Sequence, residues 1–216
     1  ELLQTPEYLQ LTPQILAAVP KIAPQSAPSL LVPIFLSKKT HDHYLVHYLR
    51  TLAEFKEQLQ PYAKLLTDAL LALKPQQLGE REKSLVLTIL LYSGLRPEAH
   101  ATVKDLLRDP EPLSWANTAA FAHAGENILP EILNLLDRFD AVFPEERIQN
   151  LRVWCGPNNL EGIRNALRGK LLSILIAICS EESMAALVDY KSKHSISIVC
   201  EGSSSLCRKR LAKAKE

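Results

Sequence analysis

The sequence has few of the features by which proteins of known chemistry are recognised. Its 216 residues include only seven glycines, one methionine and two tryptophans. No GxxxxGK[ST], GxGxxG or GxSxG motif occurs, so the sequence offers neither a glycine-rich loop for phosphate nor the nucleophile turn of serine hydrolases. These absences predict a protein that is not an enzyme and that uses no cofactor.

Cysteine is also sparse, and neither cysteine nor histidine forms a metal-binding pattern. The four cysteines are widely separated: Cys155, Cys179, Cys200 and Cys207. Without a CxxC pair they argue against a zinc knuckle and a dense disulfide framework, so we expect reduced thiols, with a disulfide across the short loop between the last two as the alternative. His43 and His47 share a helix face at a spacing used for zinc, but no third ligand accompanies them, and we predict no metal site.

Long apolar runs and an excess of one charge are missing as well. The most apolar run, residues 171–179, lies between Lys170 and Glu181 and is far shorter than the ~18–20 residues that cross a bilayer. Lys plus Arg number 25 and Asp plus Glu 24, so no global field attracts nucleic acid or an acidic membrane surface. We therefore expect a soluble intracellular protein, cytoplasmic or nuclear, that does not associate with membranes.

The chain does contain many apolar stripes at helical spacing, separated by proline. The clearest pattern lies in residues 81–107. Apolar residues cover nearly every side of its first helix, which predicts a central, buried element. Gly94 suits the left-handed conformation that ends helices, and Pro97 suits the first turn of the next one.

The same pattern recurs along the chain and predicts an all-α fold of about ten to twelve helices. We expect one domain over residues 1–200 and a basic, disordered tail over residues 201–216. Residues 109–112 are predicted to be a rigid break, Gly169 to interrupt a helix, and residues 196–199 to form the only candidate strand. Further helices are predicted over residues 27–36, 40–59, 61–73, 113–122, 127–142, 145–154, 160–167, 170–179 and 184–193. Asn158 or Asn159 is the candidate cap of the helix at residues 160–167, and Ser180, which two acidic residues and Ser183 follow, resembles the cap of the last helix.

Two segments resemble HEAT-type repeats. In residues 27–53 a proline-containing apolar helix is followed by a polar turn with Asp42 and a helix whose apolar face includes Leu45 and Leu49. Residues 129–153 follow a similar order. The resemblance implies a solenoid of stacked antiparallel helical hairpins, and the alternative is an irregular helical bundle.

A helical stack without catalytic residue types favours a non-catalytic scaffold or adaptor that binds another protein through a face or groove. Because exposed aromatic and arginine side chains supply most binding hot spots, four residues are the candidate contacts. They are Tyr92, Arg96, Trp115 and Trp154. The segment around Arg96 also resembles the first arginine box of tyrosine recombinases, but no HxxR motif follows it.

A nucleic-acid-binding helical domain is the alternative function. One basic patch comprises Arg164, Arg168 and Lys170, and the segment from Arg208 to Lys215 places five cations in eight residues. Arg208, Lys209 and Arg210 begin that segment, which suits a nuclear import signal, a nucleic-acid contact or a solvated end.

Overall fold

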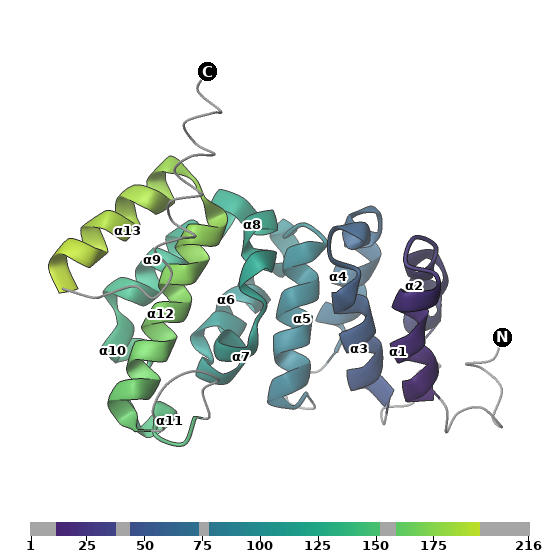
Figure 1. The fold of residues 1–216 in the computed structure, drawn as a ribbon, viewed down its shortest axis with the longest axis horizontal. Coiled ribbons are helices and arrows are strands. Elements are labelled where there is room, and N and C mark those ends of the chain that lie inside the picture. The colour runs from purple at the N-terminus through teal and green to yellow at the C-terminus, as the bar shows by residue number, and fades with distance from the viewer. Residues whose placement is uncertain (1–11, 38–43, 74–77, 152–158, 195–216) are drawn as a thin grey trace. The chain divides into compact units, whose positions relative to one another are not determined.

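The computed structural model describes residues 12–37, 44–73, 78–151 and 159–194 (Figure 1). All regular elements in these ranges are helical, which confirms the all-α prediction. None of the described helices is long and apolar enough to cross a membrane. The predicted strand at residues 196–199 and the predicted tail at residues 201–216 lie outside the described residues.

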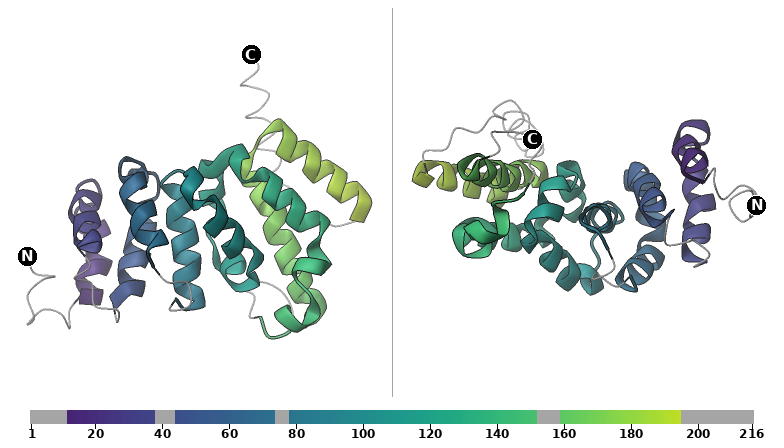
Figure 2. Two further views of the ribbon diagram at one scale, coloured as in Figure 1. Left: turned by 180° about the vertical axis from the view of Figure 1, so that it is seen from behind. Right: turned by 90° about the horizontal axis from the view of Figure 1, so that it is seen from below.

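The chain divides into two compact units, Glu1–Val103 and Lys104–Glu216, where the sequence predicted one domain over residues 1–200. The elements of unit 1 are α1 (Thr12–Ile22), α2 (Ala27–Leu36), α3 (Leu45–Glu54), η4 (Lys56–Tyr62), α4 (Ala63–Leu71), α5 (Glu80–Tyr92) and η6 (Pro97–Ala99). Helix α3 contacts both α1 and α5, and α2 contacts α4. Helices α1, α3 and α5 thus follow one another in a row, seen from the front in Figure 1 and from behind in Figure 2.

Helix α5 provides the centre of unit 1. It contacts α3, α4 and η4, and every residue from Val86 to Tyr92 is buried. The helix ends before Gly94, whose φ of +87° favours glycine, and Pro97 begins η6, which leads into α6 (His100–Arg108). The central helix and both of its boundary signals were therefore predicted correctly.

Two other helices of unit 1 are shorter than their apolar stripes predicted. Helix α3 ends at Glu54, because Lys56 has a left-handed φ of +50° and the chain continues as the 3-10 segment η4. Pro61 lies inside η4, and α4 begins only at Ala63. An apolar stripe predicts which side chains are buried but does not specify the backbone turn that connects them.

Unit 2 is built around one long helix. After α6, at which the two units meet in sequence, its elements are α7 (Pro110–Trp115), η7 (Thr118–Ala120), α8 (Phe121–Ala124), η8 (Gly125–Asn127), α9 (Leu129–Asp137), α10 (Phe139–Val142), α11 (Glu145–Ile148), α12 (Leu160–Ile178) and α13 (Glu181–His194). Helix α12 contacts α7, η7, α8, α9, α11 and α13. It is therefore the core element of this unit, as α5 is of unit 1.

Helix α12 begins as the sequence predicted but does not break at Gly169. The Asn159 side chain accepts a hydrogen bond from the Gly162 amide at 2.7 Å, a typical N-cap. The helix then continues through Gly169 to Ile178. An interior glycine costs only about 1 kcal/mol, and the buried side chains of Leu167 and Leu171 on either side of it offset that cost.

The segment before α12 is more broken than predicted. Asp109 accepts a hydrogen bond from the Glu111 amide and so begins α7, in the stretch that we expected to be only a break. The predicted helix at residues 127–142 is divided into α9 and α10 at Arg138, where φ is −105° and ψ is +26°. Phe139 and Phe143 follow this bend, and both are buried.

The junction between α12 and α13 is confirmed in one respect and corrected in another. Ser180 and Ser183 exchange side-chain-to-amide hydrogen bonds of 3.0 and 3.1 Å, which cap α13 as predicted. Cys179, which ends α12, is disulfide-bonded, whereas we had expected reduced thiols. The other three cysteines lie outside the described residues. Sequence spacing could not reveal this bond, because it does not specify which cysteines meet in the fold.

Candidate functional site

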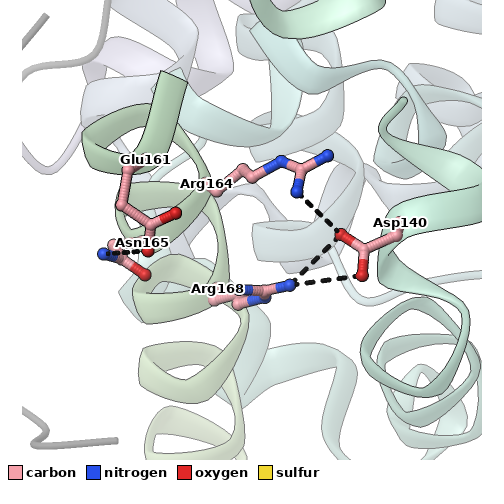
Figure 3. Close-up of polar contacts among 5 residues, drawn as sticks. All are labelled: Asp140, Glu161, Arg164, Asn165 and Arg168. Carbon is pink, nitrogen blue, oxygen red and sulfur yellow. Dashed lines mark hydrogen bonds and ion pairs between the residues drawn. The ribbon is translucent and has the colours of Figure 1, made fainter. Parts of the chain in front are cut away.

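Two of the predicted basic residues converge on one carboxylate in unit 2. Arg164 and Arg168 lie one helical turn apart on α12 and both point towards Asp140 of α10 (Figure 3). Arg168 Nη2 lies 3.2 Å from Asp140 Oδ1 and 3.5 Å from Oδ2. Arg164 Nη1 lies 3.6 Å from the same Oδ1. We call Arg164 and Arg168 the arginine pair.

The protein holds the two arginines much more firmly than it holds Asp140. The side chains of Arg164 and Arg168 are 27% and 22% exposed, and that of Asp140 is 64% exposed. The Arg168 guanidinium also lies 4.5 Å from the centroid of the buried Phe139 ring, a cation–π contact that fixes its plane. Packing therefore positions both arginine side chains, whereas the Asp140 carboxylate is mostly exposed to solvent.

Helix α13 borders the pair through Tyr190. Burial raises the pKa of the Tyr190 hydroxyl, while the charge of Arg168 lowers it and that of Asp140 raises it. Both charges therefore act on this hydroxyl. The Tyr190 ring packs on His194 with 4.3 Å between the ring centroids.

In the described part of the chain, Glu161 lies on the same side of α12 as the arginine pair, but its carboxylate forms no ion pair with either arginine. Glu161 accepts a hydrogen bond from Asn165 at 3.0 Å, and Figure 3 shows both side chains away from Asp140. Glu161 lies about 60° around the helix from Arg164 and about 20° from Arg168, so its charge is near the arginine pair although it is hydrogen-bonded to Asn165 instead.

Lys170 does not belong to this cluster. Six residues after Arg164 the helix has turned by about 240° relative to it, and Lys170 Nζ donates a hydrogen bond to the Ala116 carbonyl. Burial lowers the pKa of Lys170 to about 8. The patch predicted from sequence is thus divided into the arginine pair on one side and a half-buried lysine on another.

A second ion cluster in unit 2 was not predicted. Glu131 of α9 is only 6% exposed. Its carboxylate accepts a hydrogen bond from Arg108 Nε at 3.0 Å and lies 4.0 Å from Lys104 Nζ. These contacts join α6 and α9, so we interpret the cluster as structural. The i,i+4 spacing of Lys104 and Arg108 was its only sequence signal.

The residues predicted to contact a partner have different environments. Tyr92 is only 2% exposed, and burial and the charge of Glu57 raise its pKa, so it belongs to the core and cannot be a surface contact. Arg96 forms an ion pair with Glu98 at 3.3 Å. Trp115, at the end of α7, is 47% exposed. Trp154 and the basic segment from Arg208 to Lys215 lie outside the described residues.

Exposed apolar residues on unit 1 were not among the predicted contacts, which comprised only aromatic residues and arginines. Leu30 on α2 is 60% exposed and Leu65 on α4 is 52% exposed, although these two helices contact each other. We call these two leucines and the helices that carry them the α2–α4 face. Ile22 and Val188 are further exposed apolar residues.

Among the described residues, no group of three or more His, Cys, Asp or Glu side chains could hold a metal ion. His43, one of the histidines considered for zinc, lies outside those residues. No protein-family model, curated protein or solved structure matches this chain.

Proposed function

We propose that the protein is a non-catalytic helical scaffold or adaptor that binds another protein through the α2–α4 face. The observation that carries this proposal is the exposure of Leu30 and Leu65 on two helices in contact, while their neighbours Leu31 and Leu66 are buried. Single exposed leucines are ordinary, whereas a contiguous apolar surface marks an interaction site. The proposal is that these two leucines belong to one such surface.

We also propose that unit 1 is a HEAT-like stack of antiparallel hairpins. Support comes from the order of its contacts, in which α1, α3 and α5 follow one another and α2 meets α4. Such a stack presents whole helix faces to solvent, and these faces are the surfaces through which helical repeats bind partners. Unit 2, in which several short helices contact α12, corresponds better to the alternative of an irregular bundle.

The observations favour protein binding over nucleic-acid binding. Sequence-independent binding of nucleic acid needs several cations available for phosphates. In the described part of the predicted patch, Arg164 and Arg168 share Asp140, and Lys170 donates to a backbone carbonyl. Two arginines and one carboxylate leave at most one net positive charge there, fewer than the several cations that a phosphate backbone needs.

The test is partner capture with a variant of this face. Leu30→Asp combined with Leu65→Asp places two carboxylates on the α2–α4 face without removing any buried side chain. Gln149→Asp combined with Asn150→Asp, two exposed positions of unit 2, is the matched control. Wild-type protein and both variants are immobilised, and bound proteins are quantified by mass spectrometry after confirming equal helix content.

We expect at least one protein to be retained by the wild type and the control but lost by the leucine variant. Recovery of the same proteins by all three, or of none by any, would reject the proposal. Retention that falls steeply with salt and requires nucleic acid would favour the alternative function.

A further inference from the structure

We propose that the arginine pair is a binding site for an acidic segment of the partner protein, whose Asp or Glu carboxylates replace Asp140 between Arg164 and Arg168. This inference rests on the proposed function, since it names the chemistry of one part of the partner. Asp140 then acts as an internal substitute for the ligand while the partner is absent.

The first argument is the imbalance of charge and donors. Two guanidinium groups face one carboxylate, which leaves one positive charge uncompensated within the pair. Arg164 approaches Asp140 only at 3.6 Å, an ion pair without a short hydrogen bond. The Nε atoms of both arginines are buried and have no hydrogen-bond partner in the described part of the chain, so a ligand can reach only the terminal nitrogens. Guanidinium groups bind carboxylates best through two parallel hydrogen bonds, and the present arrangement leaves that capacity largely unused.

The second argument is preorganisation. An exposed arginine loses much rotamer freedom when it binds a ligand. Here that freedom is already restricted, because both side chains are mostly buried and the Arg168 guanidinium packs on the Phe139 ring. A ligand carboxylate would meet two cations already fixed one helical turn apart.

The third argument is that Asp140 can be displaced. Its side chain is 64% exposed, and it lies on α10, which has only four residues. Ion pairs with so exposed a member contribute little to stability. By contrast, Glu131 is 6% exposed and its ion pairs join two helices, so the same displacement is not expected there.

The surrounding charges limit how much negative charge a ligand of the arginine pair can carry. Asp189 lies on α13 close to Tyr190 and is paired with Lys193 at 2.7 Å, and Asp137, which ends α9, also acts on Lys193. These carboxylates oppose the extended run of phosphates that a nucleic acid would bring. A short acidic segment needs only the two cations present.

The experiment is an NMR titration of the full chain with hexaglutamate, in which the arginine Nε–Hε resonances of the pair are observed directly. Duplex DNA is titrated in parallel at the same ionic strength. We expect saturable shifts at Arg164 and Arg168 with hexaglutamate and smaller ones with DNA. Larger shifts with DNA, or none at either arginine with hexaglutamate, would overturn the proposal.

Variants sharpen the test in both directions. Asp140→Asn removes the competing carboxylate and keeps the side-chain shape, so hexaglutamate should bind roughly two- to fivefold more tightly, the range expected for loss of an exposed ion pair. Arg164→Gln combined with Arg168→Gln should abolish binding. Arg81→Gln, which removes an exposed arginine of unit 1, should leave it unchanged.

An unchanged affinity of Asp140→Asn for hexaglutamate would contradict the proposed site. Equal losses of that affinity in Arg81→Gln and in the double arginine variant would also contradict it. Because Asp140→Asn predicts a gain, a folding defect in the double variant cannot imitate the expected result. Failure of hexaglutamate to bind, with partner capture still dependent on Leu30 and Leu65, would reject this site and leave the proposed function standing.

Discussion

Helices α5 and α12 have the same place in the two units but end in different ways. Each carries a long run of buried residues and contacts several other elements of its unit. After α5 the chain turns at Gly94, with φ +87°, and α12 ends at Cys179, with φ +56° and ψ +39°. Glycine adopts the left-handed conformation at no steric cost, whereas for cysteine this conformation carries a steric cost.

The difference shows two ways of ending a core helix. In unit 1 the residue type itself permits the turn. In unit 2 a disulfide-bonded residue occupies the less favourable left-handed conformation at the helix end. The stability of the α5 end should depend on local sequence alone. The stability of the α12 end should also depend on redox conditions.

The largest expected effect comes from replacing one buried leucine in each of the two core helices by alanine. Leu87 and Leu172 are both fully buried, so Leu87→Ala and Leu172→Ala should each lower the free energy of unfolding by about 2–5 kcal/mol. Native-state hydrogen exchange should show faster opening mainly in the mutated unit. Equal acceleration in both units by either variant would mean that they unfold as one body.

Reduction of the Cys179 disulfide should affect unit 2 alone. A structural disulfide typically contributes about 2–4 kcal/mol, so dithiothreitol should lower the stability of α12 and α13 and leave α5 unchanged. Hydrogen exchange with and without reductant measures this, and Cys179→Ser is the control that should respond no further. Equal destabilisation of α5 would contradict the separation.

Lys170 should make the stability of unit 2 depend on alkaline pH. Its pKa is lowered from 10.5 to about 8 by burial, which corresponds to a penalty of at most about 3–4 kcal/mol. Below pH 8 the lysine is charged in both the folded and the unfolded protein, so the full cost of burying the charge applies. Between pH 8 and 10.5 the folded state loses the proton first, so stability rises with pH.

Lys170→Met should therefore stabilise the protein at pH 7 by about 1–3 kcal/mol, less whatever the hydrogen bond to Ala116 contributes. The advantage should disappear above pH 10.5. Denaturant unfolding at several pH values measures both. Tyrosines with raised pKa values titrate equally in both proteins, so the difference in unfolding free energy between them reports on Lys170 alone. A difference that stays constant from pH 7 to above pH 10.5 would contradict the titration of Lys170.

The smallest effect concerns the turn after α5. Gly94→Ala forces a Cβ into the left-handed conformation, although the site has space for it, and should cost about 1–2 kcal/mol. Gly169→Ala, inside α12 and also without close neighbours, should stabilise by up to about 1 kcal/mol. Thermal melts of both variants compare the two positions, and effects of the same sign would be unexpected.

How much could be predicted depended on whether the signal was local. The centre of α5, its end at Gly94 and the cap of α12 at Asn159 follow from residue type and spacing. The continuation of α12 through Gly169, the bend at Arg138 and the burial of Tyr92 did not, because tertiary packing determines them. For the candidate site, Arg164 and Arg168 were predicted to belong to a basic patch. Their contact with Asp140 could not be predicted, because it depends on how α10 packs in the fold.

The most direct test of the central claim, that the α2–α4 face binds a partner, is hydrogen exchange of the whole chain with and without a captured and purified partner. We predict slower exchange in α2 and α4 and no change within the already buried α5. Protection elsewhere with none on α2 and α4 would contradict the claim.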